Sequence, residues 1–172
     1  MGEVTSFELG DTSVSTANWN FGDGNTSNII SPTHIYNNEG TYTVSVTTNG
    51  VNGISTATRN IIVYATPTAT QPISSLICDD NNDGFYNFDL TAKTSAILNG
   101  QSPTQYGVRY YANAVDYANT IAITSPTNFP NTSAYQLQTI IAEVYNLDNS
   151  DCKAITTFDI QVFESPLPST SV

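Results

Sequence analysis

The run TYTVSVTT, at residues 41–48, alternates apolar side chains with threonine and serine. Successive side chains of a β-strand point to opposite faces, so this pattern is typical of a strand with one buried face. A second run, TATRNIIVYA at 56–65, follows the stretch NGVNG (49–53), whose two Asn-Gly pairs favour a tight turn. Thr, Val, Ile and Tyr recur along the chain, separated by Asn, Ser and Gly. The sequence therefore predicts a mostly β protein.

A Pro/Thr-rich stretch divides the chain. ATPTATQP (65–72) contains two prolines, mostly small residues and no charge, which is typical of a stiff, extended connector. We therefore expect two domains, residues 1–66 and 67–172, for which 172 residues suffice. The tail SPLPSTSV (165–172) resembles the connector and predicts a further domain after it. The abrupt start, without a signal peptide, predicts a piece of a longer protein.

The first segment carries three motifs in order. They are a Trp-x-Phe-Gly-Asp-Gly turn in WNFGDGNTS (19–27), then Pro-x-His-x-Tyr and Gly-x-Tyr-x-Val steps in SPTHIYNNEGTYTVSVTTNG (31–50). In this it resembles a PKD (polycystic kidney disease) domain over residues 3–64. The resemblance implies an immunoglobulin-like β-sandwich of the kind found on cell surfaces and in secreted proteins.

The individual residues of these motifs suit a sandwich. Trp19 and Phe21 alternate, so both are expected to point into one core. Tyr42 begins a strand and is expected to bond a nearby backbone group, as a tyrosine corner does. Asp23 is expected to cap the turn, and His34 to be structural, since no second titratable group near it suggests a catalytic pair.

The second segment mixes strands with short helical stretches. DLTAKTSAILNG (89–100) reads as a short helix, capped by Asp89 or Thr91 and stopped by Asn99-Gly100. Another helical turn is expected at 112–119. Strands are predicted at residues 106–112, 135–146 and 154–163. The predicted fold class is all-β, with two tandem immunoglobulin-like sandwiches, the second with a short helix.

The second segment also resembles a known class of repeats. Cys78 precedes Asp-Asp-Asn-Asn-Asp-Gly-Phe, then Phe-Asp-Leu-Thr follows, and Cys152 precedes a final strand. This pattern is similar to repeats in large surface proteins of Bacteroidetes, such as gliding-motility adhesins secreted by the type IX system. The resemblance implies an extracellular location at the bacterial cell surface, with neighbouring repeats of the same parent chain as partners.

Cys78 and Cys152 are the only cysteines, and both lie beside Asp and Asn. Two cysteines do not make a structural zinc site alone. We expect a disulfide between them and hence an oxidising compartment. It would close a loop of about 75 residues and stabilise the fold by roughly 4 kcal/mol. The alternative is two free thiols.

The stretch CDDNNDGFYNFDL (78–90) has the oxygen spacing of a calcium loop. The predicted ligands are Asp79, Asn81, Asp83, the carbonyl of Phe85, and Asp89. An EF-hand is disfavoured, because its twelfth position would be a leucine and its flanks do not read as two helices. The alternative is an Asx-rich turn without metal, whose side chains cap backbone amides.

The sequence excludes several functions and leaves two open. Catalysis is not expected, because the chain has no Gly-x-Ser-x-Gly, phosphate-cradling or His-Glu-x-x-His motif. The net charge of −11 and the absence of a basic stripe argue against nucleic acid, and no apolar run is long enough to span a membrane. We expect a monomer.

One hypothesis is a structural and adhesive fragment of a long bacterial surface protein. The other is an accessory carbohydrate-binding or spacer module of a secreted polysaccharide-degrading enzyme. In the second case exposed tyrosines would stack on sugar rings. The candidates are Tyr106, Tyr110, Tyr111 and Tyr117, with Tyr110 or Tyr111 also a candidate for the core.

Overall fold

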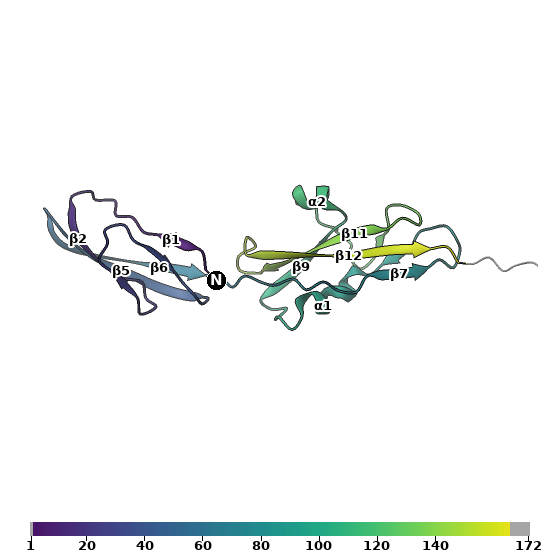
Figure 1. The fold of residues 1–172 in the computed structure, drawn as a ribbon, viewed down its shortest axis with the longest axis horizontal. Coiled ribbons are helices and arrows are strands. Elements are labelled where there is room, and N and C mark those ends of the chain that lie inside the picture. The colour runs from purple at the N-terminus through teal and green to yellow at the C-terminus, as the bar shows by residue number, and fades with distance from the viewer. Residues whose placement is uncertain (1, 166–172) are drawn as a thin grey trace, which may run out of the picture. The chain divides into compact units, whose positions relative to one another are not determined.

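The computed structural model describes residues 2–165. The chain divides into two compact units between Ala65 and Thr66, one residue before the predicted boundary (Figure 1). Both units are built mainly from strands, so the predicted all-β fold class is confirmed. Most of the tail at 165–172, on which a further domain was predicted to follow, lies outside the described residues.

The first unit is a sandwich of two unequal layers. A four-stranded sheet has the order β3-β2-β5-β6, and a two-stranded sheet pairs β1 with β4. Strands β5 and β6 pair antiparallel along their whole length and are joined at the tight turn predicted near Gly50 and Gly53. The strands are β1 (Val4–Ser6), β2 (Val14–Asn20), β3 (Thr26–Ser27), β4 (Thr33–Ile35), β5 (Gly40–Gly50) and β6 (Gly53–Val63).

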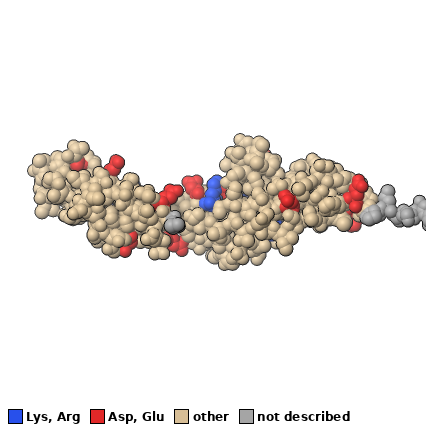
Figure 2. Space-filling model, in the orientation of Figure 1, with Lys and Arg blue, Asp and Glu red and all other residues tan. Residues whose placement is uncertain are grey.

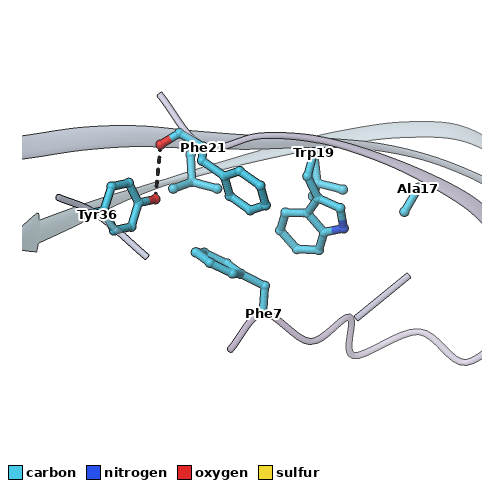
Figure 3. Close-up of a cluster of buried hydrophobic side chains, with 7 residues drawn as sticks. Phe7, Ala17, Trp19, Phe21 and Tyr36 are labelled. Atoms are coloured by element: carbon cyan, nitrogen blue, oxygen red, sulfur yellow. Dashed lines mark hydrogen bonds between the residues drawn. The ribbon is translucent and has the colours of Figure 1, made fainter. Parts of the chain in front are cut away.

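Aromatic side chains fill the space between the two layers of the first unit (Figure 3). Trp19 on β2 and Phe21 directly after it point inward, as predicted, and the ring of Phe7 packs against both, with centroids 5.4 and 5.2 Å away. Tyr36 is buried, and its hydroxyl donates a hydrogen bond to the Phe21 carbonyl at 3.0 Å. The motifs quoted above thus supply the core of this unit.

The remaining predictions for the first unit concern its turns. The hydroxyl of Tyr42 donates to the Asn38 carbonyl at 2.9 Å, so the predicted tyrosine corner is confirmed. Gly22 adopts φ +83°, and a Cβ there would lie 2.7 Å from the Thr43 carbonyl oxygen. Only glycine accommodates both the backbone angle and this close approach.

The second unit is also layered, with short helices beside its sheets. Its main sheet has the order β7-β12-β11-β9, in which β7 runs parallel to β12 and the other neighbours are antiparallel. A small sheet pairs β10 with β8. The elements are β7 (Ser75–Cys78), β8 (Asn87–Phe88), the 3₁₀ helix η1 (Leu90–Lys93), α1 (Thr94–Leu98), β9 (Tyr106–Tyr111), α2 (Ala114–Ala118), β10 (Phe129–Pro130), β11 (Gln138–Asn146) and β12 (Lys153–Phe163).

The core of the second unit is built on the main sheet. Strand β12 alternates buried side chains with more exposed ones, whereas β11 is buried on both faces from Ile140 to Val144, and η1, α1 and the β10–β8 pair add other buried side chains. Asp89 caps η1 by accepting from the Thr91 amide, and Asn99 ends α1 in the left-handed region, as predicted. The core side chains include Phe88, Leu90, Ile97, Leu98, Ile140, Ala142, Val144, Phe158, Ile160 and Val162.

The predicted connector is packed as part of the second unit. Residues 66–72 form neither helix nor strand, but Pro67 and Pro72 are buried. The Thr68 amide donates to Gln101 Oε1 at 2.9 Å, and Gln101 Nε2 donates to the Thr68 carbonyl at 2.7 Å. The stretch is therefore anchored by side chains that its own composition does not reveal.

Charged side chains are few on the surface. Figure 2 shows acidic side chains scattered in separate places over the drawn face and basic side chains at one spot. No helix within residues 2–165 has the length and apolar character needed to cross a membrane.

Candidate functional site

The polar loop after β7 is organised by one buried carboxylate. Asp79 is 5% exposed, and its Oδ2 accepts from the Gly84 amide at 2.6 Å. Its Oδ1 accepts from the Asn81 amide at 3.1 Å. Asp83 accepts in turn from the Phe85 amide at 2.8 Å and from Asn81 Nδ2 at 2.9 Å. These are the hydrogen bonds of successive Asx turns.

Distant segments lock this loop in place. Asn131 is buried and bridges it, accepting from the Tyr86 amide at 2.8 Å and donating to the Gly84 carbonyl at 2.9 Å. The Tyr135 hydroxyl donates to Asp79 Oδ2 at 3.4 Å. A Cβ on Gly84 would lie 2.5 Å from that of Ala134, so the two loops touch closely. Sequence reasoning missed Asn131 and Tyr135, because nothing local links them to a loop some 50 residues earlier.

The structure does not bring the predicted calcium ligands together. Asp89 caps η1 and accepts from the amide and hydroxyl of Thr91. Among residues 2–165, no three or more His, Cys, Asp or Glu side chains are grouped to hold a metal ion. Since backbone amides already satisfy Asp79, the residues present fit the Asx-turn interpretation better than the calcium loop. Calcium binding by Asp79, Asn81, Asp83, Phe85 and Asp89 stays an untested prediction.

We expect the loop to loosen in acid. The hydrogen bond from the Gly84 amide, with those from Asn81 and Asn82, holds the pKa of Asp79 below its ordinary value, although desolvation opposes the shift. A carboxyl with a lowered folded-state pKa contributes stability above its unfolded pKa of about 4 and loses it as the pH falls through the folded value. The protection factor of the Gly84 amide, which is its exchange rate corrected for the intrinsic effect of pH, should therefore fall below about pH 4.

Two comparisons sharpen this test. Asp79→Asn should abolish the acid dependence at Gly84, because the amide does not titrate in this range. A chelator at neutral pH should leave the Gly84 exchange rate unchanged if hydrogen bonds alone hold the loop. Faster exchange at Gly84 in the presence of the chelator would support a bound calcium ion in this loop.

The two cysteines lie beside opposite ends of strand β12. Cys78 ends β7 and pairs in register with Phe163, the last residue of β12. Cys152 directly precedes Lys153, the first residue of β12. At about 3.3 Å per residue, eleven steps separate the cysteines by roughly 35 Å, far beyond the roughly 7 Å limit between Cα atoms of a disulfide. The predicted Cys78–Cys152 disulfide is therefore wrong, and both thiols are free.

The tyrosines proposed as a sugar-stacking surface are mostly buried. Tyr106, Tyr110 and Tyr111 are 8%, 3% and 2% exposed, and half-buried Tyr117 packs edge-on against Tyr111 with ring centroids 5.1 Å apart. Strand β9 is covered on both faces, by α1 on one and α2 on the other. The prediction of an exposed tyrosine platform was wrong for this reason.

A buried acid in the middle of the main sheet was not predicted. Glu143, on β11, is 1% exposed. Its Oε1 lies 3.2 Å from Arg109 Nε and its Oε2 lies 3.0 Å from Lys153 Nζ. Contact with this carboxylate raises the pKa of Lys153, although partial burial opposes the shift. The available signal was a lone glutamate within the apolar run TIIAEVY.

His34 has an acidic neighbour that the sequence did not indicate. Its Nε2 lies 2.7 Å from Asp23 Oδ2, and its ring stacks on Phe21 with centroids 4.2 Å apart. Partial burial raises the pKa of Asp23, but hydrogen bonds from Asn25 and His34 outweigh it and leave the pKa below its ordinary value. Asp23 Oδ1 also accepts from the Asn25 amide at 3.1 Å, which confirms the predicted turn cap. The pair links the turn after β2 to strand β4.

Two family models match the chain. One, described as "Flavobacterium inter-domain disulphide bond domain", matches residues 74–168, more than half of the chain. The other, described as "PKD domain", matches residues 3–64, which confirms the PKD resemblance. The second segment thus matches a family of its own and is not a gliding-motility adhesin repeat as such.

Known relatives match mainly short stretches. The chain is 31% identical over 103 residues to collagenase ColA of Clostridium perfringens, covering 59% of this chain and 9% of the relative. It is 44% identical over 48 residues to a microbial collagenase of Vibrio alginolyticus, covering 27% and 6%. The chain therefore spans less than a tenth of these relatives. The solved PKD1 domain of Vibrio anguillarum Epp is 32% identical, covers 37% of this chain and 81% of that one, and has a TM-score of 0.32.

Proposed function

The chain belongs to the Flavobacterium inter-domain disulphide bond domain family, and on that premise we propose that it is a non-catalytic accessory piece of a longer extracellular protein. In this proposal Cys78 and Cys152 each bond a cysteine of a neighbouring domain. The name of the family supports such a bond, and the wide separation of the two thiols supports bonds to other domains over a bond between them. The oxidising compartment that such bonds require lies outside the cytosol.

The observation that carries the proposal is the separation of the two thiols along β12. One module offers one thiol at each end of its main sheet, and neither reaches the other. Residues 1–65 contain no cysteine, so the first unit does not supply the partner thiol. The partners then belong to other domains of the parent protein or to another copy of this unit.

The accessory role is supported by the relatives that match. The curated matches given above are collagenases, and this chain covers only a small part of each. The sequence has none of the catalytic motifs considered above. If the parent protein is an enzyme, its catalytic residues then lie outside residues 1–172. This chain then serves as a spacer or substrate-contacting module.

A second candidate is an adhesive segment of a cell-surface protein. The genus named in the family description, Flavobacterium, favours it, because the Bacteroidetes repeats described above come from the same group. Binding of the purified chain to insoluble polysaccharide or protein fibres supports the accessory role. Binding to whole cells alone, with no affinity for either fibre, supports the adhesive role.

We expect the purified chain to form a disulfide-linked ladder when oxidised. With oxidised glutathione as the oxidant, two thiols lose two protons and two electrons to form one cystine, and the glutathione disulfide is reduced to two thiols. A non-reducing gel should show dimers, trimers and higher multimers that collapse to monomer on reduction. Each molecule carries two distant thiols, so chains grow from both ends.

Single variants provide the controls. Cys78→Ser or Cys152→Ser should stop the ladder at dimers, and the double variant should remain monomeric. A wild-type chain that loses both thiols, stays monomeric and has gained no glutathione by mass would show that the cysteines reach each other, which contradicts the proposal.

A further inference from the structure

The first unit has an open groove along one edge of its sandwich. The two-stranded sheet faces a four-stranded one, so strand β6 has little opposite its inner face. Ala57 and Arg59 pair in register with buried Val46 and Val44 and share their face, yet both are exposed. A groove of about 450 Å³ lies here, with residues 5–10 as one wall and β5 and β6 as the other.

Both walls of the groove are suited to an extended chain. Strand β1 pairs only with β4 among the described residues, which leaves its second edge free, and β6 is an edge strand of its own sheet. An extended segment beside β1 would add a third strand to the smaller layer and cover the inner face of β6. Such strand addition uses main-chain hydrogen bonds for affinity and alternate side chains for specificity.

The indole N–H of Trp19, a residue that lines this groove, has no hydrogen-bond acceptor among the described residues. Trp19 is 7% exposed, and its Nε1 is buried without a hydrogen-bond partner among residues 2–165. Figure 3 shows the ring reaching from β2 toward the segment that carries Phe7. A Cβ on Gly10, in the groove wall, would meet no atom within 4 Å, so the space beside this wall is open. A carbonyl of an added strand would provide the missing acceptor.

The charged side chains of the groove indicate which charged side chain a bound strand would carry. Residues 1–65 contain five acidic side chains and one basic one, Arg59. Arg59 lines the groove and makes no ion pair among the described residues, while Glu8 stands on the other wall. An acidic side chain opposite Arg59 would gain an unused partner, and apolar side chains would cover exposed Ala57 and half-buried Ile61.

We propose that this groove binds a separate, extended polypeptide segment with one acidic side chain, as a third strand of the β1–β4 sheet. This site goes beyond the proposed function and is independent of the cysteines, since it lies wholly in the first unit.

The single tryptophan makes the test direct. The probe is a synthetic peptide, TVTVTDTV, whose alternation places valines and one aspartate on the same face. In the ¹⁵N-labelled full chain, Trp19 gives the only indole N–H signal. Titration with the peptide should move this signal downfield and saturate, and tryptophan fluorescence should change in parallel.

Matched variants locate the site. Ala57→Phe fills the groove and should abolish the indole shift, whereas Thr56→Phe, on the opposite face of β6, should leave it. The peptide with asparagine in place of aspartate should bind several-fold more weakly to the wild-type chain, and Arg59→Ala should remove that difference. Circular dichroism of each variant checks that it folds.

Three results would overturn the proposal. The first is an indole signal that does not move at millimolar peptide. The second is a shift that follows protein concentration without peptide, which would assign the groove to a second copy. The third is a shift caused by a cello-oligosaccharide but not by the peptide, which would make it a sugar site.

Discussion

Replacing Arg109 and Lys153 together by methionine is expected to lower the free energy of unfolding of the second unit by about 3–5 kcal/mol. Glu143 is 1% exposed, whereas the two cations are 38% and 39% exposed. The double variant strands the carboxylate in the sheet without a counter-charge, and a buried, unpaired charge is among the costliest features of a protein. Methionine keeps most of the packing that the two long side chains provide.

The rescue variant separates charge from packing. Adding Glu143→Gln to the double variant should recover most of the lost stability, because the amide carries no charge. Urea unfolding followed by circular dichroism at pH 7 measures all three proteins. A double variant as stable as wild type would show that the ion pairs contribute nothing.

Phe21→Ala is expected to destabilise the first unit by about 3–5 kcal/mol. Phe21 is 2% exposed, touches Phe7 and stacks on His34, and its carbonyl accepts from Tyr36. The truncation leaves a cavity at the centre of a core that few other large side chains fill. Because Trp19 is the only tryptophan and lies in this core, its fluorescence reports the unfolding of this unit alone.

The control for this variant lies on the strand that ends directly before Phe21. Asn18→Ala, exposed on β2, should change stability by no more than about 0.5 kcal/mol. In Phe21→Ala the unfolding of the second unit, followed by circular dichroism after the fluorescence change is complete, should keep its midpoint. If both units unfold together at a lower denaturant concentration, they do not have separate cores.

These two results bear on the proposed function. A spacer that is cross-linked at both ends of its second unit needs that unit to stay folded while the first opens or binds. Separate cores permit this. The Glu143 ion pairs join β9, β11 and β12. They therefore link β12, which begins directly after Cys152, to its neighbouring strands.

Signals within about ten residues were enough for much of the fold. The alternation around Val44 and Val46, the glycines of the turn after Phe21 and the Asp89 cap all act locally, because they depend on strand pleat, backbone angles and capping. For the same reason the inward direction of Trp19 and Phe21 could be predicted without the partner strands. The Asx turns around Asp79 are local too, although the calcium alternative remained open.

Strand order and register decided the rest. Cys78 and Cys152 are far apart only because β7 runs parallel to β12, a pairing between segments about 85 residues apart. The meeting of Glu143 with Arg109 and Lys153, the burial of the β9 tyrosines and the open groove beside β6 depend on which strands become neighbours and which remain edges. One alternating pattern is compatible with many strand orders, so these features arise only when distant strands pair and bury their faces together.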